Sequence, residues 1–436
     1  MPYAPPRHSQ LTRNPFRPDP SPFAAVMPSV DQVQVREQKE YTYDLFNKAA
    51  GKPWATLSLL GDAEYSKSIP AFVEGSPVTG EVRLDLESGD GIHAVLFSIK
   101  GQITTGATPS EMMSFIDLST TLWSRSMGDP RQPGDGNTAQ HKWNQRLKGK
   151  YVWPFSISLP PTVCIPGAFG GQDEVFRLPQ TFFERHTRAQ IEYEVVVRFT
   201  RTKLRSDHRL STTLNYMPLS APGPPSRLRQ LAYQQHTALL GPDSDPDGWR
   251  TLPFIQARGK LTSTSRPVDA RCRLSLATPL CYTRGEAIPC ALVIECSDPQ
   301  ALELLASPDA PVLRLRRAVR FLTGEKAAKE ELDHSASATW WPAADRALDT
   351  DSTDTLVTNA FRRMLKGEIH LKPELITSSS IAHFRIEYSV VLFPFDAPGY
   401  ATLDSEPLIV EPVEIASEYA SGPRPLKYSS PLSVGT

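Results

Sequence analysis

Three aspartates alternate with other residues in the segment GPDSDPDG, at Asp243, Asp245 and Asp247. Carboxylates at alternate positions begin a calcium-binding loop, because Ca²⁺ takes oxygen ligands from such positions. The Gly-x5-Glu pattern that completes such a loop does not follow. The sequence therefore predicts a polar turn at this point rather than a metal site.

The five cysteines form no recognisable zinc or redox motif. Their number is odd, no two are spaced as Cys-x-x-Cys, and no histidine cluster accompanies them. Four of the five lie in one apolar, strand-like region, which favours buried free thiols and a reducing compartment. The cysteines are Cys164, Cys272, Cys281, Cys290 and Cys296.

Catalytic patterns are absent from the sequence. It contains no Gly-x-Ser-x-Gly elbow, Walker loop, His-Glu-x-x-His or Gly-x-Gly-x-x-Gly segment. His383 lies beside an apolar strand face, without a second histidine or carboxylate at ligand spacing, which indicates a structural histidine. We therefore predict a non-enzymatic protein with no catalytic residue, no cofactor and no metal.

Two groups of basic residues are candidates for binding an acidic or phosphorylated partner, because guanidinium groups pair well with phosphate. In PVLRLRRAVRF three arginines occupy alternate positions and so share one face of a predicted strand. Arg317 falls on the opposite, apolar face, which predicts either a bulge in the strand or an internal ion pair for Arg317. The second group follows an earlier strand and is the stronger candidate. The alternative for both groups is a solvated strand face or loop. The residues are Arg314, Arg316 and Arg320, and Arg198, Arg201, Lys203, Arg205 and Arg209.

Composition limits the classes of partner and favours β structure. The 436 residues include 47 basic and 48 acidic side chains, so net charge predicts no binding to nucleic acid. The 41 prolines disfavour long helices, because proline removes a backbone donor and fixes φ. No stretch approaches the ~18 apolar residues of a membrane span, and no signal peptide is recognisable. We expect a cytosolic protein with at most peripheral membrane association.

Strands with alternating apolar residues occur in two related copies. In IEYEVVVRF the apolar residues from Ile191 to Phe199 share one face, and FRIEYSVVLF repeats the pattern from Phe384 to Leu392. A proline precedes each copy by about a dozen residues, at Pro179 and Pro373. An aromatic residue, a turn glycine and an alternating strand also repeat, as Phe72, Gly75, Val78, Val82 and Leu84, and as Tyr282, Gly285, Ile288, Leu292 and Ile294. Because both landmarks recur in the same order, the chain is predicted to contain two related β-sandwiches in tandem.

Residues rich in proline, glycine and polar side chains set the expected boundaries. We predict a disordered Pro-rich amino terminus over 1–29, a first sandwich over 30–217 and a Pro-rich linker over 218–248. A second sandwich is expected over 249–415 and a disordered tail over 416–436.

Two long surface loops are predicted outside the strands, at 127–140 and around 325–355. Two short helices are also expected. One or two helical turns fit LRQLAYQQHTALL within the linker, and a short helix fits TLVTNAFRRMLKGE, where Leu356, Ala360 and Leu365 nearly share a face.

These landmarks resemble the arrestin family over roughly residues 30–415. The first sandwich resembles an arrestin amino-terminal domain through Gly75, Val78, Gly80 and Val82, the later strand at Ile191, Tyr193, Val195 and Val197, and the segment LPQTFFE. The second resembles an arrestin carboxy-terminal domain through Tyr282, Gly285, Ile288 and the strand Ile386–Val391. The resemblance, closest in style to fungal arrestin-related proteins, implies an all-β chain of two immunoglobulin-like sandwiches.

The resemblance also implies a function. Arrestin-related proteins are cytoplasmic adaptors that bind membrane-protein cargo tails, are recruited to the plasma membrane or endosomes, and link cargo to endocytosis or ubiquitin ligation. Many recruit a WW-domain ubiquitin ligase through a PPxY or LPxY segment, which is read as a polyproline II helix. The chain has only degenerate versions, with Pro398 and Tyr400 in APGY, and with Pro425 and Tyr428 in PLKY. Ordinary turn and tail tyrosines are the alternative.

Two other functions remain open at this point. The chain is also compatible with a constitutive scaffold subunit of a sorting or signalling complex, which would bind constant partners. A β-sandwich enzyme or sugar-binding module would need a convergent polar cluster or metal site, and the sequence contains neither pattern.

Overall fold

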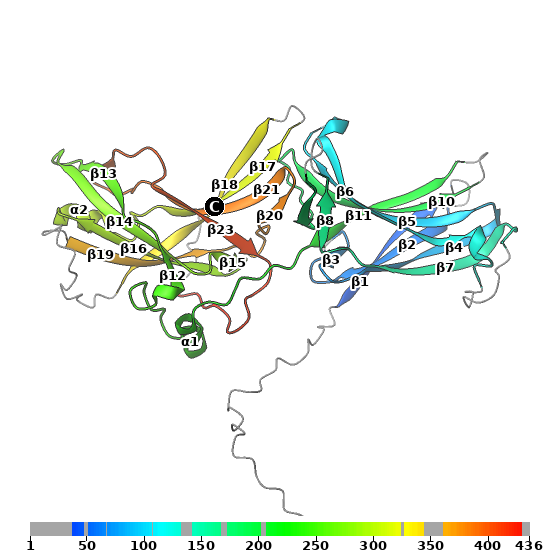
Figure 1. Ribbon diagram of the computed structural model, residues 1–436, viewed down its shortest axis with the longest axis horizontal. Coiled ribbons are helices and arrows are strands. Elements are labelled where there is room, and N and C mark those ends of the chain that lie inside the picture. The colour runs from blue at the N-terminus through cyan, green and yellow to red at the C-terminus, as the bar shows by residue number, and fades with distance from the viewer. Residues whose placement is uncertain are drawn as a thin grey trace, which may run out of the picture. The chain divides into compact units, whose positions relative to one another are not determined.

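The structure is a computed structural model in which two β-sandwiches follow one another along the chain (Figure 1). It describes residues 37–47, 51–66, 68–106, 108–131, 142–166, 172–201, 206–323, 327–343 and 361–429. The all-β class and the tandem sandwiches predicted from the alternating strands are confirmed.

The first sandwich consists of two main sheets and a hairpin. One sheet has the order β1 (Gln38–Phe46), β2 (Pro53–Asp62), β4 (Val78–Asp90) and β7 (Leu147–Ile157). The other has the order β3 (Ala71–Val73), β11 (His208–Met217), β10 (Gln190–Thr200), β5 (Ala94–Thr104) and β6 (Met112–Ser124). The hairpin pairs β8 (Thr162–Ile165) with β9 (Glu174–Arg177).

Strand β10 is central in its sheet because it pairs with β5 on one side and β11 on the other. The apolar residues predicted to share one face, Ile191, Tyr193, Val195, Val197 and Phe199, are all at most 1% exposed. Because side chains alternate across a strand, this face lies in the core, while Glu192, Glu194 and Arg198 lie on the other face. The alternation in the sequence therefore predicted the orientation of this strand.

The second sandwich is built from one continuous path of paired strands. The path runs through β15 (Cys281–Thr283), β23 (Ile409–Ala416), β21 (Phe384–Leu392), β17 (Leu313–Leu322), β18 (Ala328–Pro342), β19 (Phe361–His370), β16 (Ala287–Cys296), β14 (Pro267–Ala277), β13 (Ile255–Leu261) and β22 (Tyr400–Thr402). Two short strands lie off this path: β12 (Trp249–Thr251) pairs with β14, and β20 (Ser379–Ile381) pairs with β21.

Strand β18 joins the two layers of the second sandwich. Its first part pairs with β17 and its last part, from Ala338 to Pro342, pairs with β19. The register with β17 shifts between Leu315 and Arg316, where Ser335 is the extra residue on β18. A β-bulge of this kind increases twist and bends a strand, which suits one that passes between layers. Because the extra residue is on β18, strand β17 keeps its alternation, and a bulge in β17 does not account for the position of Arg317.

In the part of the chain that the structure describes, helical structure is limited to short segments. They are η1 (Pro109–Glu111), η2 (Arg125–Met127), α1 (Arg227–Gln235), η4 (Pro246–Gly248) and α2 (Pro299–Leu305). Helix α1 lies in the predicted linker, where a short helix was expected. The hydroxyl of Ser226 accepts from the backbone N–H of Arg229 at its start, and His236 ends it with φ of 53°. None of the helices in the described ranges is long and apolar enough for a bilayer span.

The two sandwiches repeat one tyrosine contact. The hydroxyl of Tyr193 on β10 donates to the carbonyl of Pro179 at 2.6 Å, and that of Tyr388 on β21 donates to the carbonyl of Ile376 at 2.7 Å. Both rings are buried, so each hydroxyl needs a partner inside the protein. Burial raises the pKa of both phenols. The duplicated Ile-Glu-Tyr segments thus hold equivalent positions.

The repeated aromatic–glycine turn is also equivalent in the two halves. Strand β3, with Phe72, pairs in parallel with β11, and β15, with Tyr282, pairs in parallel with β23. Gly75 and Gly285 follow with φ of 83° and 85°, a backbone conformation that disfavours a side chain. Gly80 has another role, because a Cβ there would meet the backbone oxygen of Ser58 at 2.1 Å.

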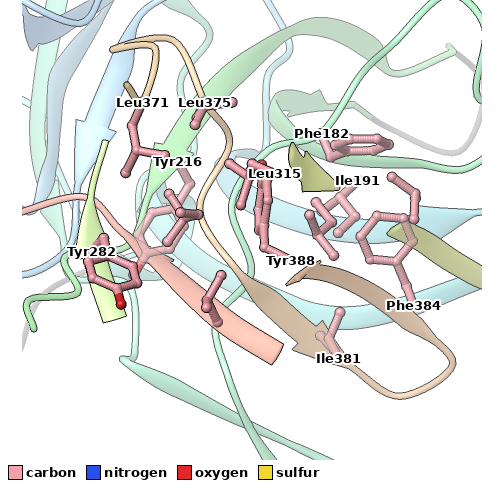
Figure 2. Packing of buried hydrophobic residues seen from close by; sticks show 14 of the residues in the cluster. Phe182, Ile191, Tyr216, Tyr282, Leu315, Leu371, Leu375, Ile381, Phe384 and Tyr388 are labelled. Atoms are coloured by element: carbon pink, nitrogen blue, oxygen red, sulfur yellow. The ribbon is translucent and has the colours of Figure 1, made fainter. Parts of the chain in front are cut away.

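Both sandwiches belong to one compact unit that begins at Gln38, and apolar side chains from each meet in it. Figure 2 shows Phe182, Ile191 and Tyr216 of the first sandwich beside Phe384, Ile381 and Tyr388 of the second. The rings of Phe182 and Phe384 lie 5.2 Å apart between centroids. These residues cover one another from water and so favour association of the sandwiches.

Three segments differ from the expectations. A surface loop was predicted around 325–355, but Ala328–Pro342 is strand β18, paired with β17 and then with β19, so this loop prediction was wrong over these residues. A helix was predicted around residues 355–368, but Phe361–His370 is strand β19, paired with β16 and β18, so this prediction was wrong from Phe361 onward. Pairing on both sides outweighs the weak helical pattern. A disordered tail was predicted from residue 416, whereas residues 417–429 are described and hydrogen-bonded to the second sandwich.

Several predictions concern residues outside the described ranges. They include the amino terminus that was expected to be disordered, most of the predicted loop at 127–140, and residues 344–355 of the second predicted loop. The four boundaries between the five predicted segments also stay predictions.

Candidate functional site: basic surfaces on the two sandwiches

Arg201, predicted to face an acidic partner, is instead bound within the first sandwich. Its guanidinium forms two hydrogen bonds with the Asp90 carboxylate, of 3.1 and 2.5 Å, and lies 5.5 Å from the ring centroid of Trp54. The side chain is only 10% exposed. Burial and Arg201 together lower the pKa of the adjacent His208. Arg201 therefore stabilises the end of the sheet and has little charge left for a partner.

Arg198 and Arg209 lie opposite one another on β10 and β11, on the outer face of the sheet. Arg209 forms an ion pair with Glu194 at 2.5 Å, and Lys100 on the neighbouring strand pairs with Asp117 at 3.1 Å. Within the described ranges Arg198 has no carboxylate within 4 Å. This face is thus mixed in charge, and Lys203 and Arg205 of the same group lie outside the described residues.

Arg314 and Arg316 form a cationic cluster at the β17–β18 bulge, with His334 and Phe393. Arg314 lies 5.8 Å from the Phe393 ring centroid, and His334 packs edge-on against the same ring at 5.4 Å. Arg316 faces His334 across the bulge. Among the described residues, neither arginine has a carboxylate within 4 Å. We call these four residues the β17–β18 cluster.

The electrostatics of the β17–β18 cluster favour an anion. Burial, Arg314 and Arg316 lower the pKa of His334, while Asp333 acts in the opposite direction. The Nε–H of Arg316 and the hydroxyl of Ser335 are buried without a hydrogen-bond partner in the described structure. A buried donor without a partner costs free energy, so an oxygen ligand there would be stabilising. The bulge therefore combines two guanidinium groups that have no carboxylate partner among the described residues with one further donor, the Ser335 hydroxyl.

Arg320 shares the strand of the β17–β18 cluster but has different surroundings. It donates to Glu330 at 2.7 Å and to Glu387 at 2.6 Å, so two carboxylates offset its charge. Arg317, which the pattern assigned to the apolar parity, donates two hydrogen bonds to Glu184 of the first sandwich, of 2.6 and 3.0 Å. The internal ion pair predicted for Arg317 is present, but its partner could not be inferred from the sequence.

The two degenerate PY segments are both packed against the second sandwich. Tyr400 on β22 is 7% exposed, although Pro398 before it is exposed. Tyr428 is half-buried, and its hydroxyl donates to the carbonyl of Thr237 at 2.8 Å. The ring of Tyr400 is therefore covered in this structure, whereas that of Tyr428 is partly accessible.

The remaining sequence candidates have structural contacts. Asp245 is buried and accepts from the hydroxyl of Ser226 at 2.6 Å, while Asp243 lies 3.5 Å from the Arg362 guanidinium. No cluster of metal-binding side chains occurs among the residues that the structure describes. Burial raises the pKa of Cys272 to about 12 and lowers the pKa of His383. Cys272, Cys290 and Cys296 are buried free thiols, whereas Cys164 is exposed.

Sequence reasoning missed three residues with notable surroundings. His334 and Phe393 belong to the β17–β18 cluster, and their only signal was proximity to a predicted strand. Glu368 on β19 is a carboxylate with 1% side-chain exposure. It was hidden inside a segment predicted as helix, where an exposed glutamate would be ordinary.

Comparison with known protein families gives a match within the first sandwich. Residues 62–215 match the family described as Arrestin (or S-antigen), N-terminal domain. The matched region extends from the end of β2 nearly to the end of β11 and contains the glycine turn and the Tyr193 strand. This match and the tandem sandwiches together support a relationship between this chain and the arrestin family. No curated protein matches the chain significantly.

Proposed function

We propose that this chain is an arrestin-like, non-enzymatic adaptor of the cytoplasm. It binds the tails of membrane-protein cargo and links that cargo to endocytosis or ubiquitin-dependent trafficking, in the manner of the fungal arrestin-related group. The match of residues 62–215 to the arrestin amino-terminal domain carries this proposal. The repeated tyrosine and glycine contacts support it by extending the same plan to the second half.

The cargo-binding surface that we assign is the β17–β18 cluster. Arg314 and Arg316 have no carboxylate partner among the described residues, while Arg201, Arg209 and Arg320 are all paired. An acidic or phosphorylated tail would supply the missing oxygens, and Arg198 on the first sandwich offers a further contact. Binding through such groups weakens with salt, because exposed charges are screened.

For ligase recruitment we favour the segment from Pro425 to Tyr428. Tyr400 pairs within a sheet and contacts Gly259, so exposing it would require the sheet edge to open. Tyr428 belongs to a segment with neither helix nor strand, which can separate from the sandwich at lower cost. The ligase contact thus depends on release of this segment.

Proximity labelling in the native cell, with the chain tagged at its amino terminus, tests the adaptor function. Enrichment of membrane transporters or receptors that is lost in Arg316→Glu supports the proposal. Lys52→Glu is the matched control, because Lys52 is an exposed residue of the first sandwich outside the β17–β18 cluster. Its substitution changes the net charge by the same amount as Arg316→Glu. Enrichment of one stable soluble complex without membrane cargo would instead favour the constitutive scaffold.

A further inference from the structure

Glu368 is a buried carboxylate that depends on the chain's own tail. Both of its oxygens accept from the backbone N–H of Tyr428 at 3.0 Å. One of them also accepts from the backbone N–H of Ser429 at 3.0 Å and from its hydroxyl at 2.8 Å. A buried carboxylate is costly without such donors. Every hydrogen bond to this carboxylate in the described structure comes from Tyr428 and Ser429.

We call residues 417–429 the tail segment. It contains no helix or strand, so a few named contacts hold it. At its start the hydroxyl of Ser417 donates to the carbonyl of Pro218 at 3.0 Å, and the carbonyl of Glu418 accepts from the hydroxyl of Thr283 at 2.8 Å. Glu368 binds its end. A segment held in this way opens more readily than a paired strand.

The end of the tail segment lines a cavity beside the second sandwich. The cavity has a volume of about 270 Å³, and Tyr428 lines it together with Trp249, Trp341 and Pro289. Lys366 also lines it, and its ammonium donates to the carbonyl of Leu239 at 2.9 Å. Detachment of Tyr428 would expose two tryptophans and an otherwise mostly apolar surface to water.

We propose that Ser429 is a phosphorylation site and that a phosphate on it releases the tail segment from Glu368. A protein kinase would transfer the γ-phosphoryl group of ATP to the Ser429 oxygen. The new bond joins that oxygen to phosphorus, the bond between the β- and γ-phosphates breaks, ADP leaves, and the hydroxyl proton passes to solvent. This inference stands independently of the adaptor function.

The contacts of Ser429 explain why the phosphate would act as a release signal. The modification removes the hydroxyl that donates to Glu368 and adds a charge of about −1.5 to −2 next to a buried carboxylate. His370, whose Nε2 lies 2.8 Å from the Ser429 oxygen, offers little compensation, because burial lowers its pKa. Lys427 is exposed and moves with the tail segment. Repulsion at Glu368 therefore outweighs the remaining hydrogen bonds.

The test uses the full chain with phosphoserine incorporated at position 429 during translation. Hydrogen–deuterium exchange follows the backbone amides of Tyr428 and Ser429, and acrylamide quenching follows the total tryptophan fluorescence, to which Trp249 and Trp341 contribute. We expect exchange of both amides to accelerate about tenfold or more, the effect of losing a charge-assisted hydrogen bond, with stronger quenching. Unchanged protection of these amides in the phosphorylated chain would overturn the proposal.

Two matched variants separate the contact with Glu368 from a general effect of charge. Phosphoserine at Ser421 adds the same charge to an exposed position of the same segment and should leave both amides protected. Glu368→Gln combined with phosphoserine at position 429 removes the repulsion and should restore part of the protection. Equal release by phosphoserine at Ser421, or no recovery with Glu368→Gln, would show that Glu368 is not the sensor.

Discussion

The ion pair between Arg317 and Glu184 offers a direct test of how the two sandwiches are held together. The two hydrogen bonds join β17 of the second sandwich to the segment before β10 in the first. Replacing Arg317 with methionine and Glu184 with glutamine, separately and together, removes the charges with little change of volume. The three variants and the parent chain form a double-mutant cycle.

The burial of the pair sets the expected magnitude. Exposed ion pairs contribute ~0.2–1 kcal/mol, and breaking a fully buried pair costs ~3–5 kcal/mol. The side chains of Arg317 and Glu184 are 16% and 28% exposed, which places the pair between these limits. Asp333, 3.8 Å from Arg317, remains as a partial partner when Glu184 is removed. We expect each single substitution to cost about 2 kcal/mol, with a coupling free energy of about 1.5 kcal/mol.

Equilibrium urea unfolding, followed by circular dichroism and tryptophan fluorescence, measures these free energies. Arg320→Met is the control on the same strand, because its two ion pairs are half-exposed and should contribute within about 1 kcal/mol. A coupling free energy below about 0.3 kcal/mol would refute the reasoning, since it lies within the error of additivity. A cost for Arg320→Met equal to that of Arg317→Met would refute it as well.

Three further predictions concern the cores and a buried carboxyl. Tyr193→Phe and Tyr388→Phe each remove the hydroxyl that donates to a buried carbonyl. Each should therefore lower the free energy of unfolding, measured by urea titration, by about 1 kcal/mol. A tenfold difference between the two losses would contradict the equivalence of the two tyrosines. Burial raises the pKa of the Glu286 carboxyl from its ordinary value of 4.5 to about 7. Between pH 4.5 and pH 7 the folded protein holds this proton while the unfolded chain has lost it, so the free energy of unfolding falls as the pH rises through this range. Glu286→Gln should therefore raise the melting temperature at pH 8 and not at pH 4, and an equal effect at both values would exclude this cause. Gly101→Ala should lower the free energy of unfolding by about 3 kcal/mol, because the new Cβ would lie 2.5 Å from the Phe115 ring. Gly75→Ala should lower it by about 1–2 kcal/mol, because Gly75 has open space around it but a φ of 83°. The reverse order in thermal unfolding would show that the sheet relaxes around Gly101.

The fold was accessible from the sequence where the side-chain period was clear. The apolar residues of β10 and β21 alternate strictly, and the two copies share Ile-Glu-Tyr, so each strand could be recognised and oriented. The region of β19 was less clear, because Leu365, Gly367 and Ile369 alternate only after Phe361 and the preceding residues fit a helix as well. Pairing with β16 and β18 decides its conformation, and such pairing has no local signal.

The candidate sites were less accessible, because they depend on residues far apart in the chain. Composition and spacing identified Arg314, Arg316 and Arg320 as one group, but the structure pairs Arg320 with Glu330 and Glu387, whereas Arg314 lies over the Phe393 ring. The sequence determined which side chains are charged and which face of a strand they share. It could not determine which charges are compensated.

The sequence by itself thus determined the β class, the duplication and the parity of each regular strand, because these follow from local periods of hydrophobicity. Only the tertiary structure decided that Arg317 meets Glu184 across 133 positions and that Glu368 receives the amides of Tyr428 and Ser429 across about 60. Hydrogen bonds and ion pairs depend on distance in space, and a folded chain brings distant residues within 3 Å without any local pattern.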